Sequence, residues 1–326
     1  MKREFASVSL ARQGESRPAG QRGVALITAL LVVSLATVAA VAMAMHQHVD
    51  VRRTANLLHG EQAYAYALAA ESWALVIMDR DAEDSENDTL EEDWATALPP
   101  IPVEGGFVNG RITDMQGRFN INNIVGDDGK PSVADKEYFD RLLVVLGLDP
   151  ALTNALIDWI DPDIDATYPD GAEDDTYLLN DPPYRAANRP LTSISELGLV
   201  KGFTAEVMTA LEPYITALPA RTGINVNTAP AEILLALNEN LTEADVDALI
   251  QGRGEEGYAG KGAFLAHDAM AGLEVHVQIG TNSDWFNVQT DVQVGNGRAR
   301  LLSQLFRIDG KSRVVSRVRT RQRLLL

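Results

Sequence analysis

Residues 21–30 read Gln-Arg-Gly-Val-Ala-Leu-Ile-Thr-Ala-Leu, and at Gly23 a basic leader gives way to a wholly apolar segment. From Val24 to Met45 the 22 residues carry no charge, and only three hydroxyl side chains interrupt the apolar run. At a rise of about 1.5 Å per residue, a helix of this length spans roughly 33 Å, enough to cross the hydrocarbon core of a bilayer. The segment therefore predicts a membrane-spanning helix.

The position of Gly23 indicates how the chain is processed. In an ordinary secretory signal the small-residue cleavage site follows the apolar region, whereas Gly23 precedes it. Cleavage between Gly23 and Val24 would leave the apolar helix on the mature protein. This arrangement resembles the type III leader of type IV pilins and pseudopilins, which a prepilin peptidase cuts on the cytoplasmic side. The alternative is a plain single-span anchor with an uncleaved basic N-terminus.

The distribution of charge predicts the orientation of the chain. Residues 1–23 carry five basic and two acidic side chains, and basic segments tend to stay in the cytoplasm. We therefore expect a single-pass protein of the bacterial inner membrane with its C-terminal ectodomain in the periplasm. The absence of cysteine avoids mispaired disulfides in that oxidising compartment. The net charge of −18 repels phosphates, so we expect no nucleic-acid partner.

The helical pattern continues well beyond the apolar segment. Residues 24–78 contain no proline, and the second half has polar residues on one side and an apolar stripe on the other. We expect one helix of about 55 residues, the first part in lipid and the second packed against a soluble domain. Residues 79–104 are acidic and contain prolines, which predicts a solvated connector.

The rest of the chain separates strands from helices. Short strands are expected at Phe107–Thr113 and Gly117–Asn120, joined by a turn, and again at Trp285–Val294, Ala299–Ile308 and Arg313–Thr320. Between them, residues 121–280 show short helices with threonine N-caps at 192, 228 and 242. This order indicates an α+β fold in which a large α-helical domain is inserted in an antiparallel sheet.

We accordingly expect five parts. They are a cleaved leader (1–23), a transmembrane half-helix (24–45), the remaining helix with the first strands (46–120), an inserted helical domain (121–280) and the C-terminal strands (281–326).

The inserted domain contains a weak internal repeat. Residues 117–124 resemble residues 222–229, and helices follow each copy. The second copy looks like a helix-hairpin-helix module, which in nucleic-acid-binding proteins presents backbone amides to phosphate. The surrounding acidity opposes such a contact, so a scaffold role is favoured.

The densest cluster of charged residues is an acidic loop at residues 158–181. It holds nine carboxylates and no lysine or arginine, and like charges this close need a compensating cation. Ligands that are all oxygen favour Ca²⁺. Aromatic and aliphatic residues interleaved with the acids favour a folded loop over the alternative of a solvated acidic run. The loop is not an EF-hand, because Glu173 falls one place later than the glutamate of that motif.

No pattern supports an enzyme. The chain lacks a GxSxG, HExxH or P-loop motif, and a run of nine acids contains carboxylate pairs at workable distances by chance. We therefore expect no catalytic activity.

The chain resembles the type II secretion system minor pseudopilin K family, also called general secretion pathway protein K. The segments that carry the resemblance follow one another along nearly the whole chain: Gly23–Thr28, Gly117–Asn120, Asp158–Asp161, Gly171–Asp174, Tyr184–Asn188, Ser195–Leu197 and Asn225–Ala229.

The resemblance implies a pseudopilin α+β fold with a calcium-binding helical domain inserted in the sheet. It implies a tip complex with the minor pseudopilins I and J, and contact with the prepilin peptidase, the inner-membrane secretion platform and exported proteins. Methylation of the new N-terminal amine is expected after cleavage. The calcium ligands that it suggests are Asp161, Asp163, Asp165, Glu173, Asp174 and Asp175.

Thr28 departs from ordinary pilins, most of which carry glutamate at this fifth mature position. A carboxylate left unpaired in lipid costs several kcal/mol or becomes protonated. A subunit at the filament tip has no neighbour ahead of it to supply a pairing amine, so a neutral residue removes that cost. We therefore expect this chain at the tip of the pseudopilus. The alternative function is a minor pilin of a type IV pilus or DNA-uptake machine.

Overall fold

The computed structural model describes residues 21–96 and 99–320, so residues 1–20 of the predicted leader, and the basic residues 321 and 323, lie outside the described residues. The described chain belongs to two compact units, residues 1–57 and 58–326, which we consider separately. Helix α1 (Gln21–Asp84) begins in the first unit and ends in the second.

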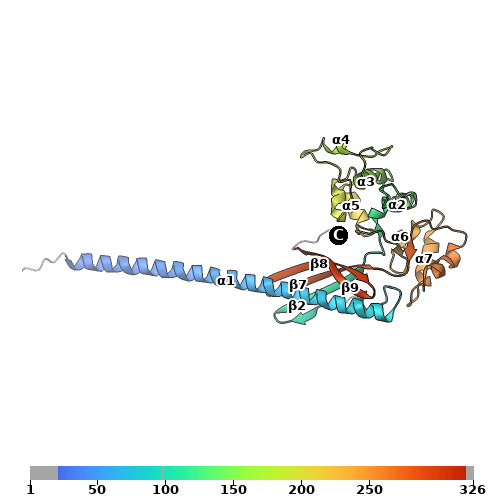
Figure 1. The fold of residues 1–326 in the computed structure, drawn as a ribbon. Helices are drawn as coiled ribbons and strands as arrows, with labels where there is room; N and C mark the ends of the chain where they lie inside the picture. The colour runs from blue at the N-terminus through green and yellow to red at the C-terminus, as the bar shows by residue number, and fades with distance from the viewer. Residues whose placement is uncertain (1–20, 97–98, 321–326) are drawn as a thin grey trace, which may run out of the picture. The chain divides into compact units, whose positions relative to one another are not determined.

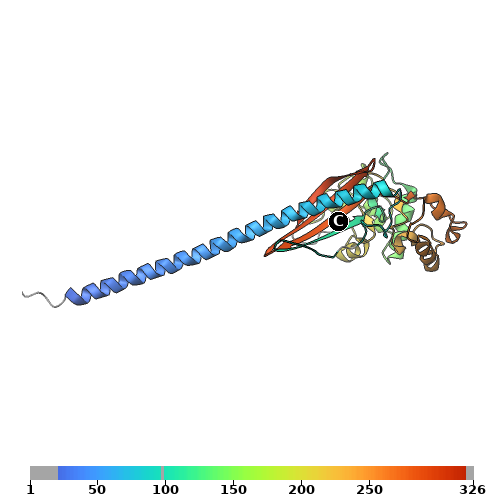
Figure 2. The same ribbon diagram turned by 90° about the horizontal axis from the view of Figure 1, so that it is seen from below.

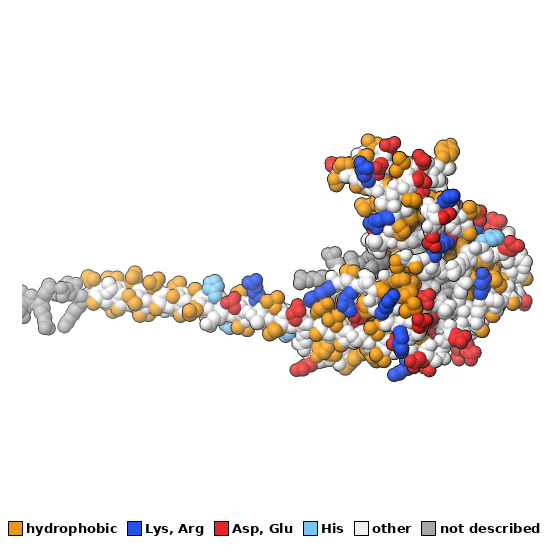
Figure 3. Space-filling model, viewed as in Figure 1, with side chains coloured by type: hydrophobic (Ala, Val, Ile, Leu, Met, Phe, Trp, Pro, Cys, Tyr) orange, Lys and Arg blue, Asp and Glu red, His pale blue; other side chains and the backbone are white. Residues whose placement is uncertain are grey.

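Within the first unit, α1 exposes only uncharged side chains over the predicted membrane span. Every residue from Val24 to Met45 is exposed, and Figure 3 shows this part of the helix covered by hydrophobic side chains. Its length and composition are sufficient to cross a membrane. The Thr28 hydroxyl donates to the carbonyls of Val24 and Ala25 at 3.0 Å, so the helix itself satisfies this polar group.

Within the second unit, five antiparallel strands form one sheet in the order β1-β2-β7-β8-β9 (Figure 1). The strands are β1 (Ile101–Val103), β2 (Gly106–Asp114), β7 (Trp285–Val294), β8 (Gly297–Ile308) and β9 (Lys311–Thr320). Residues 115–284 are therefore inserted between two hydrogen-bonded neighbours, β2 and β7. This confirms the α+β fold with an inserted helical domain.

The strands expected at Phe107–Thr113 and Gly117–Asn120 occur as β2 and the shorter β3 (Phe119–Asn120), but the expectation that both belong to the same sheet is wrong. Strand β2 already has β1 on one edge and β7 on the other, so no edge remains for a third partner. The chain leaves the sheet after Asp114, and β3 pairs in parallel with β4 (Ile215–Thr216) inside the inserted domain.

The C-terminal part of α1 packs on one face of the sheet (Figure 2). Ala63 and Ala67 are fully buried against strand residues such as Val292 and Leu301. Further along the helix, Ala74 and Met78 pack with Phe286, Val288 and Leu305. The small alanine side chains let the helix backbone approach the sheet closely. The buried face therefore differs from the apolar stripe expected from the sequence, because the larger stripe residues Leu58, Trp73 and Val76 are exposed.

Ion pairs join the same helix to β8 and β9. Arg319 lies 3.6 Å from Glu61, Lys311 lies 3.4 Å from Glu83, and Arg307 lies 3.0 Å from Asp81. Arg317 Nε donates to Glu71 at 2.8 Å, and the Ser303 hydroxyl also bonds this carboxylate, which is 3% exposed. Four of the seven basic residues between positions 298 and 319 therefore pair with acidic residues of α1. Solvent weakens the exposed pairs of Glu61 and Glu83, whereas loss of Arg317 would leave the buried Glu71 without its cation.

The acidic connector after α1 is not the solvated loop that its composition predicts. Residues 79–84 continue the helix, and β1 lies within the connector. Asp88 is 1% exposed, and both of its carboxylate oxygens accept hydrogen bonds from Arg307, at 2.6 and 2.5 Å. The charge run therefore contains a buried ion pair that composition alone does not reveal.

The inserted domain surrounds one hydrophobic core. After β3 its elements are η1 (Ile121–Ile124), α2 (Val133–Val145), α3 (Leu152–Ile160), α4 (Asp174–Tyr177), η2 (Ile194–Leu199), α5 (Ala205–Leu211), β4, β5 (Ile224–Asn225), α6 (Ala231–Leu235), α7 (Glu243–Gly252), α8 (Lys261–Leu265), η3 (Asp268–Met270) and β6 (Ile279–Gly280). Thr242 caps α7 as predicted, whereas Ser193 and Pro230 take the cap positions expected for Thr192 and Thr228.

The internal repeat has a structural counterpart. In the first copy, the Asn122 carboxamide accepts from Leu191 N and donates to Leu191 O, both at 2.9 Å. In the second copy, the Asn227 carboxamide accepts from Tyr258 N at 2.7 Å and donates to Tyr258 O at 3.2 Å. Equivalent asparagines thus hold equivalent chain segments, and this favours a scaffold role for both copies.

The hairpin between β7 and β8 touches α1 where side chains would not fit. A methyl group added at Gly297 would collide with the backbone of His59 and Gly60. We expect Gly297→Ala to lower the free energy of unfolding by about 1–3 kcal/mol, because overpacking at such a contact forces backbone shifts. The measurement is denaturant unfolding of the full chain in detergent.

Gly110→Ala is the matched control, since nothing lies within 4 Å of the added methyl on this exposed strand residue. Equal stabilities for the two variants would show that the hairpin does not rest on the helix as described.

Candidate metal site

The acidic loop connects α3 to η2 in the first copy of the repeat. Helix α3 ends at Ile160, and Asp161 follows as its C-cap. The loop folds back so that Glu173 becomes the N-cap of the short helix α4. Residues at the end of one helix and the start of another are thereby brought together, although they are twelve positions apart.

Asp158 binds the loop backbone from the buried end of α3. This fully buried carboxylate accepts hydrogen bonds from Thr167 N at 3.0 Å and from Ala172 N at 2.6 Å. Gly171 passes so close to Asp158 that an added Cβ would collide with the carboxylate. Asp158 is therefore a structural residue of the loop, because its carboxylate oxygens accept hydrogen bonds from backbone amides.

Three other carboxylates of the loop form a cluster. One oxygen each from Asp161, Asp163 and Glu173 lies within 4.8 Å of the others. Among the described residues, Asp161 Oδ1 and both carboxylate oxygens of Glu173 are buried and have no hydrogen-bond partner. Buried oxygens in this state carry a large desolvation cost unless a cation or a proton binds them.

The pKa values of two carboxyl groups in the cluster are raised, as expected where no positive charge lies nearby in the described part of the chain. Burial, followed by the charges of Asp163 and Asp158, raises the pKa of Asp161 to about 7. Burial, followed by the charges of Asp158 and Asp161, raises the pKa of Glu173 to about 7. A divalent cation among these oxygens would replace the protons and stabilise all of the negative charges.

The other predicted ligands lie outside this three-residue cluster. Asp165 is exposed, and its backbone N–H donates to Asp163 Oδ1 at 2.9 Å. Asp174 pairs with Arg185 at 3.2 Å and accepts from Ala186 N at 3.1 Å. Asp175 is exposed on α4. The structure thus brings together Asp161, Asp163 and Glu173 of the six candidates.

Two side chains outside the acidic run help to shape the loop, and sequence reasoning did not identify either. Asn188 donates from Nδ2 to the Asp163 carbonyl at 2.6 Å, and its Oδ1 is buried without a partner among the described residues. Lys201 donates to the carbonyls of Asp170 and Gly171 at 3.2 and 3.4 Å. The only sequence signal was that Asn188 lies in one of the segments carrying the family resemblance.

An aromatic cluster supports the loop on its inner side. Trp159 and Tyr177 meet edge to face with ring centroids 5.1 Å apart, and Tyr177 stacks on Tyr184 at 5.4 Å. Burial of these rings explains why the acidic run folds instead of remaining solvated. The resulting oxygen-only donor set fits Ca²⁺, which accepts carboxylate and carbonyl ligands in flexible geometry.

Comparisons with known proteins agree on one family. Residues 117–220 and residues 224–288 match two sequence families, both described as Type II secretion system (T2SS), protein K. The type II secretion system protein K of Pseudomonas aeruginosa is 37% identical over 91% of this chain and 92% of its own length. That of Klebsiella pneumoniae is 36% identical over 87% and 92%.

A solved structure shows the same fold. In the crystal structure of the GspK-GspI-GspJ complex from the type 2 secretion system of enterotoxigenic Escherichia coli, the matching chain is 27% identical to this one. It superposes with a TM-score of 0.74 over 83% of this chain and 100% of its own length. All these matches name type II secretion, so the alternative of a type IV pilus or DNA-uptake subunit is not favoured.

The raised pKa values predict an unusual pH dependence for the metal-free protein. The folded state binds protons at Asp161 and Glu173 more tightly than the unfolded chain, so folding is stabilised as the pH falls from about 8 to about 5. We expect the melting temperature in excess chelator to rise over this range. Asp161→Asn should remove part of the rise, and Asp165→Asn, on an exposed residue, should not.

Proposed function

The chain belongs to the type II secretion system protein K family and is a minor pseudopilin, and from this premise we propose that it stands at the tip of the pseudopilus with the minor pseudopilins I and J. There it would initiate or cap assembly of the filament that exports folded proteins from the periplasm across the outer membrane. Its role is assembly and not catalysis.

The observation that carries the tip position is the neutral residue at Thr28. Its hydroxyl bonds the carbonyls of Val24 and Ala25 within the same helix, so it needs no partner from a neighbouring subunit. The inserted domain supports the same position. It occupies residues 115–284, between adjacent strands β2 and β7, and a domain of that size is hard to accommodate inside a filament shaft.

Processing and orientation follow the same proposal. Prepilin peptidase would cut between Gly23 and Val24, and the new amine would be methylated. The apolar part of α1 would then lie in the inner membrane, with the ectodomain in the periplasm. A helix with the length and composition to span the membrane supports this arrangement.

We further propose that the three-residue cluster of the acidic loop binds Ca²⁺ as a structural ion. Asp161, Asp163 and Glu173 would hold the ion, which would supply positive charge to carboxylate oxygens that otherwise lack a partner. Asp158 and Lys201 would hold the loop backbone in place around it. Ca²⁺ binding would thus fasten the end of α3 to the start of α4.

The test of the tip position is co-purification from membranes of cells that produce all the minor pseudopilins. We expect the wild-type chain and Thr28→Gln to bring down both I and J. Thr28→Glu should reduce recovery of the complex and impair secretion, because it places a carboxylate without a partner amine in lipid.

Thr28→Gln is the matched control, since it has the size of glutamate without the charge. If Thr28→Glu assembled and secreted normally and localised along the shaft, the argument for the tip would be wrong.

The test of the calcium site is the melting temperature of the full chain in detergent, with Ca²⁺ or with chelator. A ligand at 100 times its Kd stabilises the folded state by about 2.7 kcal/mol. For a chain of 326 residues that corresponds to a shift of about 4 °C. We expect Asp161→Asn to abolish most of the shift and Asp165→Asn to preserve it. An unchanged melting temperature on chelation would exclude the site.

A further inference from the structure

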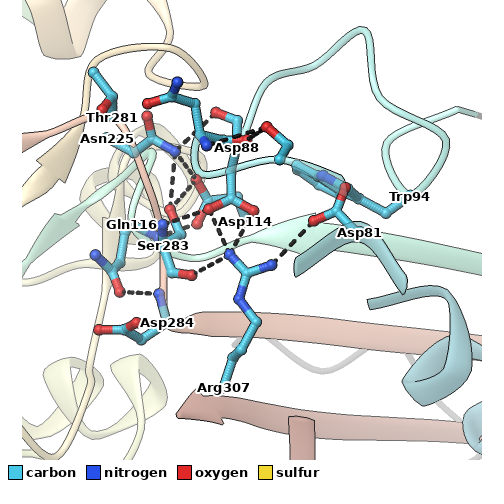
Figure 4. Close-up of polar contacts among 12 residues, drawn as sticks. Asp81, Asp88, Trp94, Asp114, Gln116, Asn225, Thr281, Ser283, Asp284 and Arg307 are labelled. Atoms are coloured by element: carbon cyan, nitrogen blue, oxygen red, sulfur yellow. Dashed lines mark hydrogen bonds and ion pairs between the residues drawn. The ribbon is translucent and has the colours of Figure 1, made fainter. Parts of the chain in front are cut away.

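A second group of acidic residues lies where the inserted domain leaves and rejoins the sheet. Asp81 comes from the end of α1, Asp88 from the connector and Asp114 from the end of β2, and Arg307 on β8 is the cation among them (Figure 4). We call these four residues the junction cluster. Arg307 donates to Asp81 at 3.0 Å, to both oxygens of Asp88 and to the Ser283 carbonyl at 2.7 Å.

Hydrogen bonds of the cluster connect the sheet to the inserted domain. Asp114 accepts from the hydroxyls of Thr228 and Ser283, from Asn225 Nδ2 at 3.2 Å and from Gln116 N at 2.7 Å. Asp88 accepts from Ser283 N at 2.6 Å. Asn225 and Thr228 belong to the second copy of the repeat, so hydrogen bonds to the cluster join this part of the inserted domain to the end of β2.

The cluster contains more negative than positive charge. Two further carboxylates interact electrostatically with the cluster: the charge of Glu92 repels that of Asp81, and the charge of Arg307 attracts that of Asp284. A second cation, Arg118, attracts the charge of Asp114. Five carboxylates therefore face two guanidinium groups in a largely buried region. Oxygens of Asp81, Asp88 and Glu92 lie within 4.8 Å of one another, close enough for each negative charge to favour protonation of its neighbours.

The hydrogen-bond donors at this cluster argue against a metal ion. Asp88 and Asp114 accept several bonds from Arg307, backbone amides, an amide side chain and hydroxyls, whereas the buried oxygens of Asp161 and Glu173 have none. Glu92 Oε2 likewise accepts from Thr89 N at 2.9 Å and from Trp94 Nε1 at 2.8 Å. Arg307 already occupies the position between the acids, so the remaining charge deficit calls for a proton.

We propose that the junction cluster is a proton-operated latch, in which one proton shared among its carboxylates holds the inserted domain firmly on the pseudopilin sheet and loss of that proton loosens the junction. When the proton leaves, carboxylates from α1, the connector and β2 repel one another. This repulsion opposes the hydrogen bonds that Asn225, Thr228 and Ser283 donate across the junction.

The titration range supports a latch that works near neutral pH. Burial, followed by the charge of Glu92, raises the pKa of Asp81 to about 6. Burial raises the pKa of Asp88 to about 7 even beside Arg307, and burial also raises that of Asp114. The closed junction therefore binds a proton more tightly than an open one. It is stabilised below about pH 6 and loses this stabilisation as the pH rises through about 7.

The test is backbone hydrogen exchange of the full chain in detergent, at saturating Ca²⁺, between pH 6 and pH 8. The reporters are the amides of Asp88, Asn225 and Ser283, which bond Thr281 O, Gln116 O and Asp88 respectively. After correction for intrinsic exchange, we expect their opening constant to rise by up to about 10-fold over this range, as one linked proton with a pKa near 7 requires. Amides of the β7–β8 ladder should not change.

Two variants distinguish the latch from a general effect of pH. Asp81→Asn removes one of the competing charges and should flatten the dependence, while Glu83→Gln, an exposed residue on the same helix, should leave it as in the wild type. Glu92→Gln keeps the acceptor for Thr89 and Trp94 and should move the transition to lower pH. A wild-type junction with no pH dependence, or the same dependence in Asp81→Asn and Glu92→Gln, would overturn the proposal.

Discussion

The rest of the structure depends on one constraint: ion pairs hold helix α1 against strands β8 and β9, near the C-terminal end of the chain. Glu71 of α1 is buried and pairs with Arg317 of β9, and Asp81 near the helix end pairs with Arg307 of β8. Each pair joins residues more than 220 positions apart. Removing one partner would leave a buried charge without its counter-ion, which lowers the free energy of unfolding by several kcal/mol. The C-terminal strands must therefore return to the helix, whatever the chain does between.

Because the C-terminal strands pack against α1, an inserted domain must begin and end close to the same sheet. Strands β2 and β7 are hydrogen-bonded neighbours, so the inserted residues leave and rejoin the sheet at adjacent points. Within the inserted domain, Asn122 and Asn227 hold equivalent segments in two copies of one motif. The connection after α3 in the first copy is the long acidic loop, whereas the corresponding connection after α7 in the second is the short segment up to Tyr258. The candidate metal site thus lies in the longer of two equivalent connections.

Local patterns predicted the elements that depend on local chemistry. The apolar run and its amphipathic continuation predicted α1, and alternation of side chains predicted β7 with the bounds that the structure has. Pairings between distant residues left no such pattern. The parallel pair β3–β4, the Asn122 contact with Leu191 and the burial of Asp88 by Arg307 each depend on the topology. For the metal site, composition predicted an acidic loop that needs a cation. It could not show that Asp174 pairs with Arg185 while Glu173 remains without a donor.

The most direct test of the whole account is the mass of the N-terminal peptide of the protein extracted from membranes of secreting cells. We expect a mature chain that begins at Val24 with a methylated amine. The part of α1 after Gly23 has the length and composition to span a membrane, and the C-terminal part of the same helix supports the sheet. A protein that begins at Met1, or one cut after the apolar segment, would contradict the account.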